Sequence, residues 1–375
     1  MRVLAVLSSL MGGGAERQMT LMLRHLDRER FDPTLCLLSG AEADYLPDLP
    51  PGLRVVDLGK RSAGDVAKIT WRLSRLVASG RYDLLVSRVD YTNLVSVAAT
   101  RLARRAVPVV CVEDSVQSRE LAGRKDRHLR AALVRATYRR ATVVVTPTPG
   151  VRSEVLESVP RSSTSVVVIS NMVDVAEVRR AGEEPASHPF LTGGLPLVVA
   201  AGRLDRAKGF DVLLEALARV NERRACQLAL LGKGPELGSL RQLASRLGIS
   251  GRVHFAGFVG NPFAWMARAD LVVCSSRWES FGNVLVEAMA LGKAIVSTAA
   301  PYGPALLVDD GRNGLVAPVD DPARLAELIE TALDDPVLAA RLGDEGRRRA
   351  EAFDAPVVTR RFEAVFEEAV RETRS

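Results

Sequence analysis

Short runs of valine, leucine and isoleucine recur along almost the whole chain, and segments with the spacing of amphipathic helices lie between them. Within each run the hydrophobic residues are nearly continuous and do not alternate with polar ones. Continuous hydrophobicity indicates strands that are covered on both faces, which is typical of parallel sheets with helices on each side. The pattern therefore predicts an α/β protein with doubly wound parallel sheets.

The runs form two groups. The first reads RVLAVLSS, PTLCLL, LRVVDL, YDLLVS, VPVVCV, ATVVVT and SVVVIS, and the second LPLVVAAG, CQLALLG, RVHFAGF, ADLVVCSS, KAIVST and NGLVAPV. Between them, residues 172–196 are polar and rich in glycine and proline, which is typical of a linker. We therefore expect two Rossmann-like domains facing a cleft, residues 1–185 and 186–352, with ligands at the carboxyl ends of the strands. Residues 353–375 have the pattern of an amphipathic helix that could pack back on the N-terminal domain.

Composition fits two globular domains, since 47% of the 375 residues are apolar. No apolar run approaches the roughly 18–20 residues of a membrane-spanning helix. The apolar start leads directly into a glycine loop and a helix pattern, so it predicts a buried strand and not a signal peptide. The four scattered cysteines predict buried thiols in a reducing cytoplasm. The four histidines do not have the spacing of metal ligands, and the chain has no Asp-x-Asp motif. We therefore expect no metal and no cofactor.

Charge is unevenly divided along the chain. Residues 1–185 carry 28 Lys/Arg and 21 Asp/Glu, whereas the remaining residues carry 23 and 24. Residues 119–140, RELAGRKDRHLRAALVRATYRR, hold eight basic and two acidic side chains. A basic helical segment of this kind is typical of a surface for anionic lipid or nucleic acid. An ordinary solvated face is the alternative.

The second group opens with AAGRLDRAKGFDVLLEALARV, in which a strand ends at Gly202 and a helix follows Gly209. Arg203 and Lys208 lie in the turn. Two cations beside a helix N-terminus attract a diphosphate through their charges and through the free backbone N–H groups. One arginine and one lysine near a turn are common, so this motif is only moderately specific.

Gly12, Gly13 and Gly14 also follow a strand and precede a helix. A dinucleotide fingerprint needs G-x-G-x-x-G, and Arg17 occupies the third glycine position, so NAD binding is not expected. The glycines allow close approach of a ligand to the backbone, or they form a tight turn without a ligand.

Residues 277–298, RWESFGNVLVEAMALGKAIVST, predict a loop, a helix from Val284 to Leu291 with Asn283 as N-cap, and a strand. Glu279 then lies in the loop and Glu287 about one turn inside the helix. Two solvated glutamates on a surface helix are the alternative to a binding site.

Six motifs occur in the order found in glycosyltransferase family 4: GGGAER, GRLDRAKGFDVLLEAL, LLGKGPE, VHFAGFV, ADLVVCSSRWESFGNVLVEAMALGKAIVST and PYGPALLVDDGRNGLVAP. The chain resembles this family over nearly its whole length, most strongly over residues 198–335. The resemblance implies a retaining transferase of GT-B architecture that uses nucleotide sugars.

Carried over by position, the resemblance makes Glu279 and Glu287 the two acids of the family's E-x7-E element. Glu279 would meet the donor sugar, and Glu287 would accept hydrogen bonds from the nucleotide ribose. Arg203 and Lys208 would bind the diphosphate. Together with Glu279 they form the expected catalytic set, in which the cations stabilise the leaving group in place of a metal ion.

The resemblance also assigns backbone groups to the donor. The loop of Gly12, Gly13 and Gly14 would close over donor phosphate and acceptor. N–H groups at the start of the helix would hold sugar hydroxyls and phosphate, from Phe281, Gly282, Asn283 and Val284.

On the acceptor side the chain departs from many relatives. They carry a histidine after the strand that matches VPVVCV, where this chain has Glu113, Asp114 and Ser115. Glu113 and Asp114 are therefore the candidates for the acceptor-side group.

The resemblance implies transfer of a hexose or N-acetylhexosamine, with retention, from a nucleotide-diphosphate sugar (UDP favoured) to a lipid-linked or polysaccharide acceptor of the cell envelope. We expect a cytoplasmic protein, peripheral on the inner face of an anionic membrane, and no nucleic-acid partner. Two alternatives stay open, a nucleotide-sugar 2-epimerase on the same scaffold and a non-catalytic donor-binding homologue.

Overall fold

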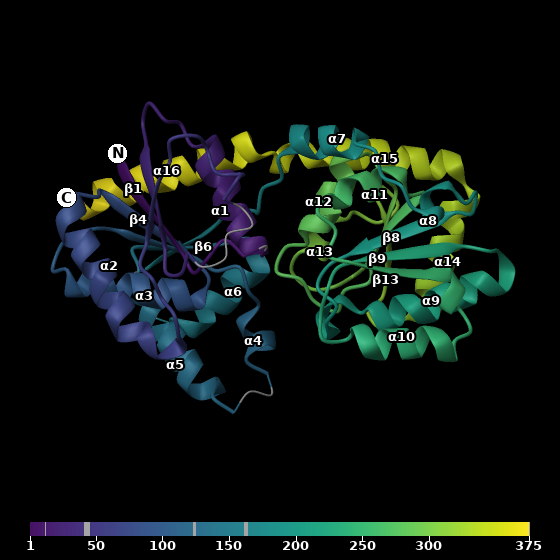
Figure 1. Ribbon diagram of the computed structural model, residues 1–375, viewed down its shortest axis with the longest axis horizontal. Helices are drawn as coiled ribbons and strands as arrows, with labels where there is room; N and C mark the ends of the chain where they lie inside the picture. Colours follow the sequence, from purple (N-terminus) through teal and green to yellow (C-terminus); the bar gives the residue numbers. More distant parts are fainter. Residues whose placement is uncertain (12, 41–45, 123–124, 161–163, 375) are drawn as a thin grey trace. The chain divides into compact units, whose positions relative to one another are not determined.

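The computed structural model describes residues 1–11, 13–40, 46–122, 125–160 and 164–374. The chain divides into two compact units (Figure 1). Unit 1 comprises Met1–Met172 and Ala355–Ser375, and unit 2 comprises Val173–Asp354. Each unit is a parallel sheet with helices on both faces, as the hydrophobic pattern predicts.

The sheet of unit 1 has the order β3-β2-β1-β4-β5-β6-β7 in the described residues, and all of its pairings are parallel. Its strands are β1 Arg2–Leu7, β2 Asp32–Leu37, β3 Arg54–Asp57, β4 Leu84–Arg88, β5 Val109–Val112, β6 Val143–Thr146 and β7 Ser165–Val168. Its helices are α1 Gly14–His25, α2 Val66–Gly80, α3 Asp90–Leu102, α4 Gln117–Glu120, α5 Arg127–Tyr138, α6 Pro149–Ser158 and α16 Ala355–Arg374.

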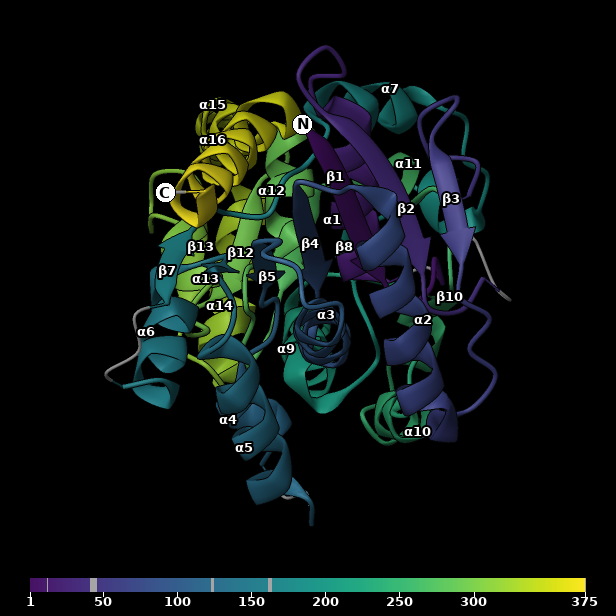
Figure 2. The same cartoon turned by 90° about the vertical axis from the view of Figure 1, so that its left-hand side faces the viewer.

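Successive residues of the central strands in unit 1 are buried on opposite faces, whereas the edge strand β3 is largely exposed. Val3 and Ala5 of β1 pack with α1 and α16, whereas Leu4 and Val6 pack with α2 and α3. Figure 2 shows α2 and α3 beside strands β1 and β4. Burial of both strand faces explains why the apolar runs are continuous.

The sheet of unit 2 has the order β10-β9-β8-β11-β12-β13 in the described residues and is also parallel. Its strands are β8 Leu197–Ala201, β9 Gln227–Leu231, β10 Val253–Gly257, β11 Leu271–Cys274, β12 Ile295–Thr298 and β13 Leu315–Ala317. Its helices are α7 Val175–Glu183, α8 Pro189–Thr192, α9 Phe210–Arg223, α10 Leu237–Arg246, α11 Pro262–Arg268, α12 Asn283–Ala290, α13 Pro304–Leu307, α14 Pro322–Asp334 and α15 Pro336–Ala350.

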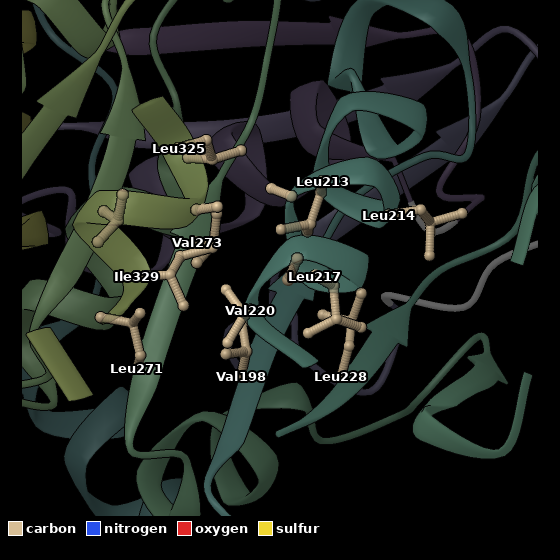
Figure 3. Packing of buried hydrophobic residues seen from close by; sticks show 14 of the residues in the cluster. Val198, Leu213, Leu214, Leu217, Val220, Leu228, Leu271, Val273, Leu325 and Ile329 are labelled. Carbon is tan, nitrogen blue, oxygen red and sulfur yellow. The ribbon is translucent and has the colours of Figure 1, made fainter. Parts of the chain in front are cut away.

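Two apolar layers cover the sheet of unit 2. Figure 3 shows one of them, in which Val198 and Val273 of the strands meet Leu217 of α9 and Ile329 of α14. On the other face, β8 and β11 pack against α7, α11 and α12. The two layers hold the strand ends, and the loops that leave them, in fixed positions.

The expected linker over residues 172–196 is instead largely helical. Helix α7 begins after Asp174, whose side chain accepts a hydrogen bond from Glu177 N, and it packs against α11 and α12. The boundary between the units therefore falls at 172/173, earlier than the expected 185/186. The final helix begins at Ala355 and belongs to unit 1, where it packs against α1, β4 and β5.

The four cysteines are buried and unpaired, as expected. No helix in the described part of the chain is both long enough and apolar enough to cross a membrane.

Candidate active site

The candidate donor site lies where the strand order of unit 2 reverses. Strands β8 and β11 are neighbours, and the chain leaves them toward opposite sides of the sheet. Loops at such a switch point diverge and leave room for a ligand at the carboxyl ends of the strands. Residues 202–209 follow β8 and residues 275–282 follow β11. The two stretches singled out in the sequence therefore meet at one point.

Lys208 and Glu279 are in contact at this point. The Lys208 ammonium pairs with Oε1 of Glu279, and Ser276 Oγ donates a second hydrogen bond to the same oxygen at 2.8 Å. The side chains of Lys208 and Glu279 are only 22% and 14% exposed. Burial by itself lowers the pKa of Lys208, but the adjacent carboxylate outweighs burial and raises that pKa above its usual value. Lys208 is therefore a fixed positive charge at the switch point.

Gly209 allows the Lys208 loop to lie against the loop after β11. Its φ is +59°, and a β-carbon at this position would lie 2.1 Å from the carbonyl oxygen of Ser275. Ser275 in turn donates a hydrogen bond from Oγ to the Lys208 carbonyl at 2.9 Å. Only glycine combines this backbone conformation with so close an approach.

Arg203 occupies the same loop but does not join the pair. Its side chain is 73% exposed, and its Nε lies 3.6 Å from Oδ2 of Asp205. The structure thus places one predicted cation in the buried pair and leaves the other exposed to solvent near the strand end.

Glu287 is buried in helix α12. It is 5% exposed, although its neighbours in this helix are mostly apolar. Helix α12 begins at Asn283, and its N-cap is Gly282, at φ +98°. The N-cap is therefore one residue before Asn283, the residue expected in this position. Phe281 is fully buried against Phe353, whereas Val284 is half-buried. The alternative of two solvated glutamates is wrong, because Glu279 and Glu287 are both largely buried.

Unit 1 has its own switch point, between β1 and β4. Helix α1 is the next element after β1 and begins at Gly14, with Gly13 as N-cap, and Gly12 lies outside the described residues. A β-carbon on Gly13 would lie 2.2 Å from Oε2 of Glu16, so this carboxylate occupies the space beside the glycine. Burial raises the pKa of Glu16 above its usual value, and the charge of Asp114 acts in the same direction.

Asp114 is held by an arginine that sequence reasoning missed. Arg88, the last residue of β4, is 2% exposed and donates from Nε and Nη2 to the two oxygens of Asp114 at 2.6 and 2.7 Å. Its Nη2 also donates to Oδ1 of Asn171 at 2.9 Å, and its Nη1 is buried without a hydrogen-bond partner among the described residues. Val89 follows at φ +74°, an uncommon conformation for a β-branched residue and one that concentrates at functional sites.

Glu113 performs a different task from Asp114. It is completely buried, and its oxygens accept hydrogen bonds from Ser115, from Gln117 Nε2 at 2.8 Å and from the hydroxyl of Tyr138. Burial raises its pKa to about 7 despite these hydrogen bonds. Glu113 thereby ties the segment after β5 to helix α5, and Asp114 is the more accessible of the two acceptor-side candidates.

The basic segment does not form the single helix that its pattern suggests. Helix α4 ends at Glu120 and helix α5 begins at Arg127. Leu129 and Leu133 of α5 are 65% and 40% exposed, whereas Tyr138 is buried. The helix therefore presents an apolar edge among exposed arginines.

Across the described ranges, no three His, Cys, Asp or Glu side chains are grouped to hold a metal ion. The expectation that the reaction needs no metal stays a prediction.

Both units match known families. Residues 187–349 match the family described as glycosyl transferases group 1, and residues 13–172 match the glycosyl transferase 4-like domain. The chain is 35% identical over 209 residues to the lipopolysaccharide core biosynthesis glycosyltransferase LpsE of Rhizobium meliloti. This match covers 56% of the chain and 59% of that relative. It is 24% identical over 361 residues to N-acetylgalactosamine-N,N'-diacetylbacillosaminyl-diphospho-undecaprenol 4-alpha-N-acetylgalactosaminyltransferase of Campylobacter jejuni. This match covers 94% of the chain and 95% of that relative.

Solved structures share the fold of the whole chain. The Anabaena protein HepE, in complex with UDP-glucose, superposes with a TM-score of 0.83 at 23% identity and covers 98% of this chain and 100% of that one. WaaG, a glycosyltransferase involved in lipopolysaccharide biosynthesis, superposes with a TM-score of 0.76 at 18% identity, covering 97% and 99%. With a glycosyltransferase domain matched on each unit and this fold, the chain is a glycosyltransferase of the GT-B class.

Proposed function

We propose that this protein transfers a hexose or N-acetylhexosamine from a UDP-sugar to a lipid-linked or polysaccharide acceptor, with retention of the anomeric configuration, in cell-envelope glycan synthesis. The observation that carries the proposal is the buried Lys208–Glu279 pair at the switch point of unit 2. Such a pair places a cation for the leaving diphosphate directly beside a carboxylate for the transferred sugar.

The donor chemistry follows from these positions. As the glycosidic bond breaks, negative charge grows on the β-phosphate, and Lys208 with the exposed Arg203 stabilises it. Because Lys208 is already held in place, little reorganisation is needed when the charge develops. Glu279 accepts hydrogen bonds from sugar hydroxyls, and Glu287 accepts them from the ribose. Backbone N–H groups at the start of α12, from Phe281 to Val284, complete the donor site.

We place the acceptor on unit 1. The carboxylate of Glu16 beside Gly13 disfavours a phosphate there but suits a sugar hydroxyl. Asp114 is the second acceptor-side carboxylate, and Arg88 fixes its orientation. In this proposal Gly13 and Gly14 bring the backbone close to the acceptor rather than to the donor phosphate.

The relatives and helix α5 favour a membrane-bound acceptor. The Campylobacter relative is named for a diphospho-undecaprenol substrate, and the Rhizobium relative for lipopolysaccharide core biosynthesis. The exposed Leu129 and Leu133 of α5 lie among arginines, a combination that suits an anionic lipid surface. We therefore propose that the protein works in the cytoplasm, peripherally on the inner face of the membrane.

Product analysis tests the proposal. The protein is incubated with a panel of UDP- and GDP-sugars and a polyprenyl-diphosphate-linked N-acetylhexosamine, and the lipid product is examined by mass spectrometry. We expect one added sugar residue in the mass spectrum with a UDP-sugar, and an anomeric configuration in the product, measured by proton NMR, that matches the configuration of the donor.

Two controls separate the alternatives. Donor incubated alone reports a 2-epimerase, because an isomerase changes the sugar without an acceptor. A protein that binds UDP but never releases it from a UDP-sugar in the presence of any acceptor would be a non-catalytic homologue. Either result would overturn the proposed transfer.

A further inference from the structure

The Arg277 side chain makes several hydrogen bonds next to the candidate donor site. Arg277 lies in the loop after β11, two residues before Glu279, and its side chain is 16% exposed. Nη1 and Nη2 donate to the two oxygens of Asp211 at 2.9 and 2.8 Å. Nε donates to Oδ1 of Asp320 at 2.6 Å.

These hydrogen bonds join three loops. Besides the two aspartates, Nη1 donates to the Arg206 carbonyl at 3.0 Å, and the backbone N–H of Arg277 donates to the Ala207 carbonyl at 2.7 Å. Arg206 and Ala207 precede Lys208, and Asp211 lies in the first turn of helix α9, just after it. Asp320 follows β13. Arg277 therefore fastens the loop that carries Lys208 to the loop that carries Glu279, from both sides of Lys208.

The clamp stays charged over the physiological pH range. The hydrogen bond to Asp211 raises the pKa of Arg277 further above its usual value. Burial raises the pKa of Asp211, but the hydrogen bonds and charge of Arg277 outweigh burial, so that this pKa is lowered overall. Lysine could not replace the guanidinium, because an ammonium cannot bind both oxygens of Asp211 and reach Asp320 and a carbonyl at the same time.

We propose that Arg277 is a positioning residue that sets the separation of Lys208 from Glu279 and thereby the fit of the donor diphosphate. This inference rests on the proposed donor site. Arg277 makes no contact with the nucleotide in this account and acts only through the Lys208 loop. Its loss should therefore weaken recognition of the diphosphate and leave recognition of the nucleoside unchanged.

Nucleotide titrations by calorimetry test this separation. The variants are Arg277→Gln, Arg277→Lys and Asp211→Asn, and Arg223→Gln is the control, since Arg223 pairs with Glu330 at the far end of α9. We expect Arg277→Gln and Asp211→Asn to raise the Kd for UDP roughly tenfold or more, as for the loss of one charge-assisted hydrogen bond. The Kd for uridine should stay unchanged, Arg277→Lys should rescue little, and the control should bind UDP as the wild type does.

Hydrogen exchange of the protein without nucleotide reports the clamp itself. Several amides in the Lys208 loop are hydrogen-bonded, including Leu204 N to Lys233 O at 2.9 Å and Lys208 N to Asp205 O at 3.1 Å. In Arg277→Gln these amides should exchange faster while the rest of unit 2 keeps its protection.

Three results would overturn the inference. They are unchanged UDP affinity in Arg277→Gln, an equal loss of UDP and uridine affinity, and unchanged exchange of the Lys208 loop. If the wild-type protein binds neither UDP nor uridine, the proposed donor site fails, and the inference fails with it.

Discussion

Glu113 should make the stability of unit 1 depend on pH in an unusual direction. Its carboxyl is completely buried, and burial raises its pKa from 4.5 to about 7. Between these two values the folded protein holds a proton that the unfolded chain has released. The free energy of unfolding therefore falls as pH rises through this window, by about 1.4 kcal/mol per pH unit for this one group.

The total effect is large for a single side chain. From pH 5 to pH 8, the ionisation of Glu113 should cost unit 1 about 3 kcal/mol. Glu113→Gln resembles the protonated carboxyl in shape and has no proton to lose. The stability of the variant relative to the wild type should thus rise by about 3 kcal/mol over the same interval.

Urea unfolding at pH 5 and pH 8, followed by circular dichroism and fitted with a separate transition for each unit, measures this difference. Comparing variant and wild type at each pH cancels the titration of all other groups. Glu157→Gln, which changes an exposed glutamate of α6, is the matched control and should show no such trend. A Glu113→Gln difference that is equal at both pH values, or that shrinks as pH rises, would refute the reasoning.

Three further predictions concern ligands. Glu287→Ala should weaken UDP binding by roughly 1–3 kcal/mol, the cost of a lost hydrogen bond to a carboxylate, and calorimetry that finds no change in a folded variant would remove the ribose assignment. Alanine at Arg203 or Lys208 should lower kcat by roughly 10²–10³, because each charge meets the leaving group in the transition state, whereas a rise in KM alone would indicate uniform binding. Serine at Lys125 and Arg127 together should reduce sedimentation with anionic liposomes at low salt and leave UDP affinity intact, and a wild type that ignores such liposomes would favour a soluble acceptor.

Hydrophobic pattern was sufficient to predict the sheets. Each of the thirteen apolar runs overlaps one of the strands of the described chain, because the central strands, which are covered on both faces, need apolar residues at nearly every position. Helix α7 was missed because its exposed face makes the segment look polar. Val175, Val178 and Ala181 nonetheless have helical spacing and are among its buried residues, so a signal was present.

The site was only partly predictable, for a physical reason. The sequence places Lys208 and Glu279 at strand ends, but their contact depends on β8 lying next to β11, and strand order is not encoded in the hydrophobic pattern. The same holds for Arg88 and Asp114, which meet because β4 pairs with β5. A charged residue at the end of a buried strand was the only sequence signal for Arg88.

A crystal structure of the protein with UDP would test the central assignment most directly. We expect the diphosphate to lie against Arg203 and Lys208 at the carboxyl ends of β8 and β11, with the ribose hydroxyls on Glu287. A nucleotide found beside Gly13 of unit 1, or in unit 2 with its diphosphate away from Lys208, would contradict the account.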